Sequence, residues 1–246
     1  MKIIGDLNKS KIMLIHGAGF HWNNCFREVI RSLKDDHCII IPFLPGHCDE
    51  RKELMESVEK TSIDITKQLF RENIKEIDIV YGISLGASVA LEIALNNAIT
   101  IRKIVLDGGQ YVSMGEQAEF FSGIMSKQFM NLLKGEHLQK EIRDNMGYKD
   151  NDIEILKPML YEYITEEVLY SAFMAAYNYD ITTRDKKLSV PKVLVIFGSK
   201  EIYAKNSCSI LKPLISNEFS IKEIDNMGHS EALSLHPDFI VDILKE

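Results

Sequence analysis

Short runs of Ile, Val and Leu constrain the fold of this chain more than any other feature of its sequence. A glycine lies within or just after each of the four main runs, which are Ile12–Ile15, Ile77–Ile83, Ile104–Leu106 and Val193–Phe197. Continuous apolar runs of this length are typical of strands that are buried on both faces, as in a parallel sheet. Cys38–Ile41 predicts a fifth strand, and the alternating Phe219–Ile224 predicts an edge strand.

Segments with helical patterning separate these runs. They are Phe20–Leu33, Leu54–Glu72, Leu85–Asn96, Ser207–Leu214 and Pro237–Leu244. Alternation of strand and helix predicts the α/β class, with an open, doubly wound and mostly parallel sheet.

One long segment interrupts this alternation. Residues 111–187 have helical patterning without a convincing strand, and they hold seven of the nine Tyr and six of the ten Met. We predict a helical cap, inserted before the penultimate strand and lying over the carboxyl edge of the sheet. The predicted core domain then comprises residues 1–110 and 188–246.

Charge and composition argue against several classes of partner. The formal net charge of the 246 residues is -7, and Lys and Arg form no run longer than a pair, which argues against a nucleic acid partner. No apolar run approaches the length that spans a bilayer, and residues 1–10 are too polar for a secretory signal. The four cysteines form no Cys-x-x-Cys pair and no zinc-site spacing, so we expect free thiols and a cytoplasmic protein.

Gly82-Ile83-Ser84-Leu85-Gly86 is a strict G-x-S-x-G motif between a predicted strand and a predicted helix. This setting is what a nucleophile elbow requires, because the turn projects the serine oxygen at the carboxyl edge of the sheet. The alternative is a glycine-lined turn in which Ser84 only caps the helix. The motif lacks the G-K-[ST] ending of a phosphate-binding loop.

His16-Gly17-Ala18-Gly19 follows the first strand. The dinucleotide fingerprint fails here, because its third glycine would fall at Trp22. A turn of this kind can instead present the backbone N–H of Ala18, which together with the N–H of Leu85 would hold an oxyanion. A plain glycine turn is the alternative.

Taken together, these motifs resemble the α/β-hydrolase superfamily over nearly the whole chain. Leu44-Pro45-Gly46-His47 looks like a loop of that family in which Cys48 replaces the usual glycine, Gly198-Ser199-Lys200-Glu201 resembles its G-x-x-D element, and Gly228-His229 resembles its G-H element. The order serine, acid, histidine is the order of the family. The stretch before Lys11 is short for the usual opening antiparallel strands, so the resemblance predicts a trimmed sheet.

The resemblance implies a catalytic triad of Ser84, His229 and Glu201. In such a triad the histidine takes the serine proton and the carboxylate orients the histidine. Glu201 stands where the family usually has Asp, and Asp107, at the end of the preceding strand, is the alternative acid. Asp225 is closer to His229 in the sequence, but it looks like part of a loop.

The predicted substrate pocket lies under the cap. His16 and Gly17 at its rim and Phe120, Phe173 and Tyr177 from the cap are candidate lining residues. Aromatic side chains and Met in the cap suit an acyl chain, but they also suit the cap's own core. We therefore expect an apolar pocket for a small-molecule acyl ester, and neither a metal nor an organic cofactor is implied.

The leading functional hypothesis is a serine hydrolase that cleaves a small or medium carboxylic ester through an acyl-enzyme. An acyltransferase, a thioesterase or a carbon–carbon bond hydrolase would use the same triad. A ligand-binding receptor or interaction module of the same fold is the alternative from another class, since a fold does not fix a function.

Overall fold

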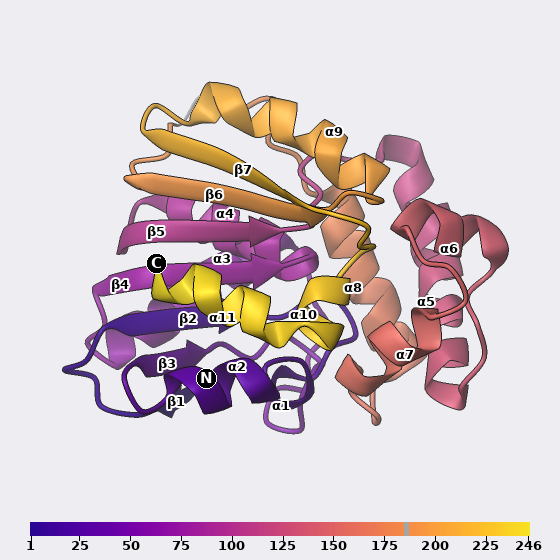
Figure 1. The fold of residues 1–246 in the computed structure, drawn as a ribbon, viewed down its shortest axis with the longest axis horizontal. Helices are drawn as coiled ribbons and strands as arrows, with labels where there is room; N and C mark the ends of the chain where they lie inside the picture. Colours follow the sequence, from indigo (N-terminus) through magenta and orange to yellow (C-terminus); the bar gives the residue numbers. More distant parts are fainter. Residues whose placement is uncertain (185–186) are drawn as a thin grey trace.

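The predicted strands lie side by side in one sheet of the computed structural model, which describes residues 1–184 and 187–246 (Figure 1). Its seven strands are β1 (Lys2–Ile4), β2 (Lys11–Ile15), β3 (Cys38–Ile41), β4 (Glu76–Ile83), β5 (Thr100–Asp107), β6 (Lys192–Gly198) and β7 (Glu218–Ile224). They are arranged in the order β1-β3-β2-β4-β5-β6-β7, and only β1 runs antiparallel to its neighbour. The prediction of a mostly parallel, doubly wound sheet is confirmed. The stretch before Lys11 forms a single antiparallel strand, in which the three residues of β1 pair with β3.

The strand order places a crevice at the centre of the sheet. The chain passes from β2 to β3 on one side and then returns to β4 on the other side of β2. In open α/β sheets the carboxyl ends of the strands on either side of such a reversal form the ligand-binding crevice. Ile15 of β2 pairs with Gly82 of β4, so the loops that follow these two strands leave the sheet together.

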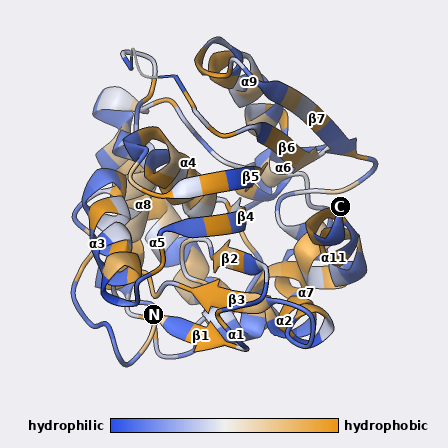
Figure 2. Ribbon diagram, turned by 90° about the vertical axis from the view of Figure 1, so that its left-hand side faces the viewer, coloured by the Kyte–Doolittle hydropathy of each residue, from blue (hydrophilic) through white to orange (hydrophobic). Residues whose placement is uncertain are grey.

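Helices cover both faces of the sheet. They are α1 (Trp22–Cys25), α2 (Arg27–Leu33), α3 (Val58–Arg71), α4 (Leu85–Asn96), α9 (Ile202–Leu211), α10 (Glu231–Leu235) and α11 (Pro237–Lys245). In Figure 1, α2 and α11 lie in front of the sheet, and α3 and α4 lie behind it. Figure 2 shows hydrophobic residues along β3 and a mixture of polar and apolar residues along α3.

Three predicted helices differ in their bounds or continuity in the structure. Helix α3 begins at Val58, four residues after the predicted start at Leu54, and the Ser57 side chain caps it. The segment Phe20–Leu33 breaks into α1 and α2 at Phe26, whose ψ of 8° is not helical. Phe26 is completely buried and packs edge-on against Tyr81, so tertiary packing decides its conformation. Helix α9 begins at Ile202, five residues before the predicted start at Ser207.

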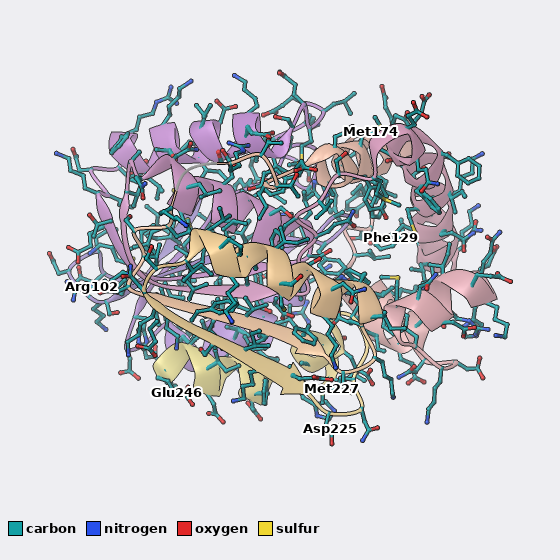
Figure 3. All side chains as sticks on the ribbon, turned by 90° about the horizontal axis from the view of Figure 1, so that it is seen from above. Arg102, Phe129, Met174, Asp225, Met227 and Glu246 are labelled. Carbon is teal, nitrogen blue, oxygen red and sulfur yellow. The ribbon has the colours of Figure 1, made fainter. Side chains whose placement is uncertain are left out.

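Between β5 and β6, the described residues form helices and no strand. The helical insertion (residues 111–184) contains η1 (Gly115–Gln117), α5 (Ala118–Lys134), α6 (Lys140–Met146), α7 (Asp152–Leu156), η2 (Lys157–Met159) and α8 (Glu166–Asn178). It lies at the carboxyl ends of the strands, and Figure 3 shows its Phe129 far from Arg102, which is near the start of β5. Residues 185–186 of the predicted cap segment lie outside the described residues.

Tyrosines attach the helical insertion to the sheet domain. The hydroxyl of Tyr148 donates to the His229 carbonyl at 2.6 Å, that of Tyr161 to Asp49 at 2.8 Å, and that of Tyr179 to Glu92 at 3.0 Å. These bonds account for part of the concentration of Tyr in this segment, because Tyr combines an apolar body with a polar tip. No helix among the described residues is long and apolar enough to cross a bilayer.

Candidate active site

Ser84 occupies a sharp turn between β4 and α4. Its φ of 55° and ψ of −123° lie in a region that side-chain-bearing residues rarely adopt. A Cβ atom on Gly82 would lie 2.2 Å from the Gly86 carbonyl oxygen, and one on Gly86 would lie 2.2 Å from the Ile15 carbonyl oxygen. The motif therefore has glycines where strand, turn and helix leave no room for a side chain, and Ser84 projects beyond them.

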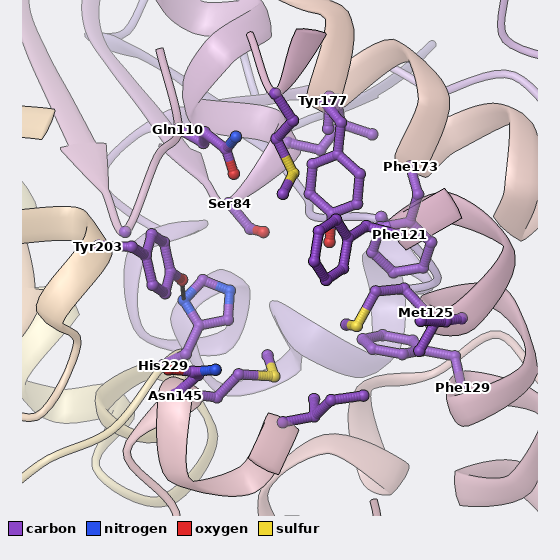
Figure 4. A pocket seen from close by; sticks show the side chains of 18 of the residues that line it. Ser84, Gln110, Phe121, Met125, Phe129, Asn145, Phe173, Tyr177, Tyr203 and His229 are labelled. Atoms are coloured by element: carbon purple, nitrogen blue, oxygen red, sulfur yellow. Dashed lines mark hydrogen bonds between the residues drawn. The ribbon is translucent and has the colours of Figure 1, made fainter. Parts of the chain in front are cut away.

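Glu201 and His229 are joined by a hydrogen bond. Glu201 follows β6 at the start of α9, His229 follows β7, and their Oε2 and Nδ1 atoms are 2.7 Å apart. Both side chains are buried, and the Gly198 N–H donates to the other Glu201 oxygen at 2.6 Å. An Nδ1–H that donates to a carboxylate leaves Nε2 as the proton acceptor of the imidazole. Figure 4 shows that Ser84 and His229 point into the same cavity.

Gly108 makes room for this pair. Its φ is +54°, and a Cβ atom there would lie 2.8 Å from Glu201 Oε2 and 2.9 Å from His229 Nδ1. A side chain at position 108 would therefore both strain the backbone and displace Glu201 or His229.

Asp107, the alternative acid, has a different partner. It ends β5, is buried, and accepts a hydrogen bond from the Tyr81 hydroxyl at 2.6 Å. Burial, followed by the nearby charge of Glu201, raises the pKa of Asp107 to about 7. Its backbone carbonyl accepts from the Ser84 N–H at 2.8 Å, so Asp107 supports the elbow from below.

The loop after β2 lies against the serine. Ala18 and Leu85 both line the cavity, and Leu85 is the first residue of α4, where the N–H has no partner within the helix. His47 supports this loop: its Nε2 accepts from the Gly19 N–H at 2.9 Å and its Nδ1–H donates to the Pro45 carbonyl at 2.7 Å. Burial lowers the pKa of His47 to about 4, which keeps its imidazole neutral for these two roles.

A cavity of about 480 Å³ extends from Ser84 into the helical insertion. Its apolar wall comes from α5 and α8 and includes Phe121, Ile124, Met125, Phe129, Phe173 and Tyr177 (Figure 4). Polar or charged side chains of Gln110, Gln139, Glu141 and Asn145 line other parts, and the described lining residues include neither Lys nor Arg.

Three predicted lining residues lie outside the cavity lining. Phe120 is 67% exposed and its neighbour Phe121 faces the cavity instead. Gly17 packs behind Ser84, because a Cβ atom there would lie 3.1 Å from Ser84 Cβ. His16 is buried beneath the loop, where its Nδ1–H donates to the Gly17 carbonyl at 2.9 Å. Burial and the neighbouring His47 lower its pKa to about 3.

The sequence matches the model of the alpha/beta hydrolase family over residues 12–243. The chain belongs to this alpha/beta hydrolase family. A crystal structure of an alpha/beta hydrolase family protein from Desulfitobacterium hafniense has 40% sequence identity and a TM-score of 0.96, over 99% of this chain and 98% of the other. A search among curated proteins found no match.

More distant structures share the fold. MenH from S. aureus is 18% identical with a TM-score of 0.78, covering 99% of this chain and 96% of its own. A thermophilic esterase from Thermogutta terrifontis is 16% identical with a TM-score of 0.73, covering 99% of this chain and 90% of the esterase chain. At these identities the comparison establishes the alpha/beta hydrolase fold alone.

Tyr203 of this alpha/beta hydrolase is a cavity-lining residue that its sequence did not predict. Its side chain lines the cavity and its hydroxyl lies 2.6 Å from His229 Nδ1 and 3.1 Å from Glu201 Oε2. No motif marks this position. The only available signal was its place two residues after the candidate acid.

Proposed function

We propose that this alpha/beta hydrolase cleaves small or medium carboxylic esters through an acyl-enzyme, with Ser84 as nucleophile, His229 as base and Glu201 as acid. The observation that carries the proposal is the convergence of Ser84, in its strained turn, and the hydrogen-bonded His229–Glu201 pair on one cavity. Each comes from the end of a different strand, as sites in open α/β sheets do.

The residues have distinct roles in the proposed reaction. His229 Nε2 takes the Ser84 proton as the serine oxygen attacks the ester carbonyl, and the N–H groups of Ala18 and Leu85 stabilise the oxyanion. The imidazolium then protonates the leaving alcohol. Water, activated by His229, attacks the acyl-enzyme and releases the acid, which restores Ser84. Every step is proton transfer or acyl transfer.

The cavity lining supports an uncharged, apolar acyl group. Phe121, Met125 and Phe129 offer apolar surface to an alkyl chain, and a carboxylate on that chain would be desolvated there without a cationic partner. In this proposal the helical insertion acts as the cap of residues 111–187, which selects the acyl chain.

Turnover of p-nitrophenyl esters from acetyl to long-chain acyl tests the proposal. We expect hydrolysis of short and medium esters, with kcat reduced roughly 10⁴-fold or more in Ser84→Ala. A half-ester of a dicarboxylic acid should react much more slowly than the neutral ester of equal length. Ser122→Ala is the matched control, because that hydroxyl donates to the Ala118 carbonyl, at 2.7 Å, within α5.

Three results would count against the proposal. Equal rates in Ser84→Ala and wild type would exclude Ser84 as the nucleophile. Binding of esters without turnover would favour the receptor alternative. A faster reaction with thioesters, or with alcohols as acceptors, would move the function to a thioesterase or an acyltransferase with the same triad.

A further inference from the structure

The Tyr203 hydroxyl forms a closed triangle with the acid and the base. It lies 2.6 Å from His229 Nδ1 and 3.1 Å from Glu201 Oε2, and these two atoms are 2.7 Å from each other. The ring of Tyr203 lies beside the imidazole, with a centroid distance of 5.8 Å, and Figure 4 shows the bond to His229. Tyr203 is therefore in direct contact with both partners of the triad hydrogen bond.

The three atoms allow one consistent placement of protons. An ionised carboxylate only accepts, so the contact between Oε2 and Nδ1 requires the proton on Nδ1. The Tyr203 oxygen lies close to the same Nδ1–H, so it accepts from this group with one of its lone pairs. Its own proton then points to Glu201 Oε2.

Tyr203 retains this proton. Burial, together with the charge of Glu201, raises the pKa of Tyr203 well above its usual range. The neutral hydroxyl therefore directs its proton toward the Glu201 carboxylate and a lone pair of its oxygen toward the His229 Nδ1–H.

We propose that Tyr203 is a positioning residue, which holds His229 in the Nδ1–H tautomer and stabilises the imidazolium that forms when Ser84 loses its proton. This inference rests on the proposed function of Ser84, His229 and Glu201. The fixed tautomer keeps the Nε2 lone pair available to Ser84, and the oxygen of Tyr203 adds a second acceptor for Nδ1–H as positive charge develops.

The other groups around His229 do not supply this contact. Asp107 bonds to Tyr81, Tyr148 donates to the backbone carbonyl of His229, and Glu231 accepts from the Gly228 N–H at 2.8 Å. Apart from Glu201, Tyr203 is thus the only described residue whose side chain hydrogen-bonds to the imidazole Nδ1. Replacing Tyr203 by Phe leaves all these other groups in place.

Kinetics of Tyr203→Phe test the inference. We expect kcat to fall roughly ten-fold, the scale of one hydrogen bond to a charged group, while KM changes less than about two-fold. The acid limb of the kcat/KM profile should move to lower pH, because the imidazolium loses a stabilising oxygen. Tyr179→Phe is the matched control: it removes a hydroxyl that donates to buried Glu92 at 3.0 Å, and it should leave all three quantities unchanged.

The outcomes separate this inference from the proposed function. If Ser84→Ala is inactive but Tyr203→Phe keeps the wild-type kcat and acid limb, the role of Tyr203 is wrong and the triad stands. A fall in kcat without movement of the acid limb would also contradict it, since that is the effect of a purely structural residue. If Ser84→Ala retains full activity, the proposed function itself fails.

A measurement on the wild type applies even if Tyr203→Phe does not fold. In protein labelled with ¹⁵N-histidine, we expect the His229 proton on Nδ1 at neutral pH, with a nuclear Overhauser contact to the Tyr203 ring. A proton on Nε2, or no contact with Tyr203, would overturn the inference.

Discussion

The two sides of the cavity are specified in different ways. At the carboxyl edge of the sheet, backbone segments pack so closely that Cβ atoms on Gly82 and Gly86 would lie 2.2 Å from carbonyl oxygens. In the helical insertion, a Cβ atom on Gly123 of α5 would meet nothing within 4 Å. The sheet edge therefore requires particular residues at particular positions, whereas the cavity wall formed by α5 and α8 requires only apolar side chains of suitable size.

This difference fits the chemistry proposed for each side. A catalytic triad works only when its reacting atoms are held within fractions of an ångström, which rigid strand ends provide. An apolar wall binds an acyl chain by contact area, which many combinations of Phe, Met and Ile supply. Substitutions at the sheet edge should accordingly reduce stability and activity, whereas substitutions in the apolar wall should change acyl-chain specificity.

Gly86→Ala should have the largest effect. Its new methyl group would overlap the Ile15 carbonyl, which belongs to a buried strand that cannot move aside. We expect the free energy of unfolding to fall by about 3 kcal/mol, with loss of activity, as urea denaturation and ester turnover would measure. Gly123→Ala is the control, and should raise stability by up to about 1 kcal/mol without changing kcat. Equal decreases in the free energy of unfolding of the two variants would contradict the comparison.

Phe121→Ala should change specificity rather than folding. Removing a side chain from the apolar wall lengthens the cavity, so the kcat/KM ratio of long to short acyl esters should rise roughly ten-fold. Phe120→Ala is the matched control, because Phe120 packs edge-on against Phe121 but is 67% exposed. If both variants shift the ratio equally, Phe121 does not line the acyl site.

Asp107→Asn should have little effect on stability at low pH and a growing effect as pH rises. The pKa of Asp107 is raised to about 7, so between about pH 4 and pH 7 the folded state holds a proton that the unfolded state has lost. Wild-type stability should therefore decrease relative to the Asn variant by up to about 1.4 kcal/mol per pH unit in this window, and level off above it. Urea unfolding at pH 5 and pH 8 measures the change, and a constant difference would refute it.

The same contrast explains what the sequence could predict. Gly82, Ser84 and Gly86 stand out because backbone crowding permits few residues there, and the continuous apolar runs identify buried parallel strands. Phe120 and Phe121 are adjacent and identical, so composition could not decide which one faces the cavity; the rotation of α5, set by its packing on α8, decides it. His16 was expected at the rim, but its loop folds over it.

Tyr203 was missed for a related reason. The predicted helix begins at Ser207, so the sequence gives residues 202–206 no defined direction. The structure begins α9 at Ile202, directly after Glu201, and the first helical turn brings the phenol back to His229. A single sequence carries no signal for this return, because it depends on where the helix starts relative to the strand end.

Labelling with a fluorophosphonate, followed by mass spectrometry of the peptides, tests the proposed triad most directly. Such reagents report a serine made nucleophilic by a neighbouring base, and they do not require the natural substrate. We expect one phosphonyl group per chain, located on Ser84, absent in Ser84→Ala and formed at least about 100-fold more slowly in His229→Gln. An adduct on another residue, or equal labelling rates in wild type and His229→Gln, would contradict the assignment of Ser84 and His229 as nucleophile and base.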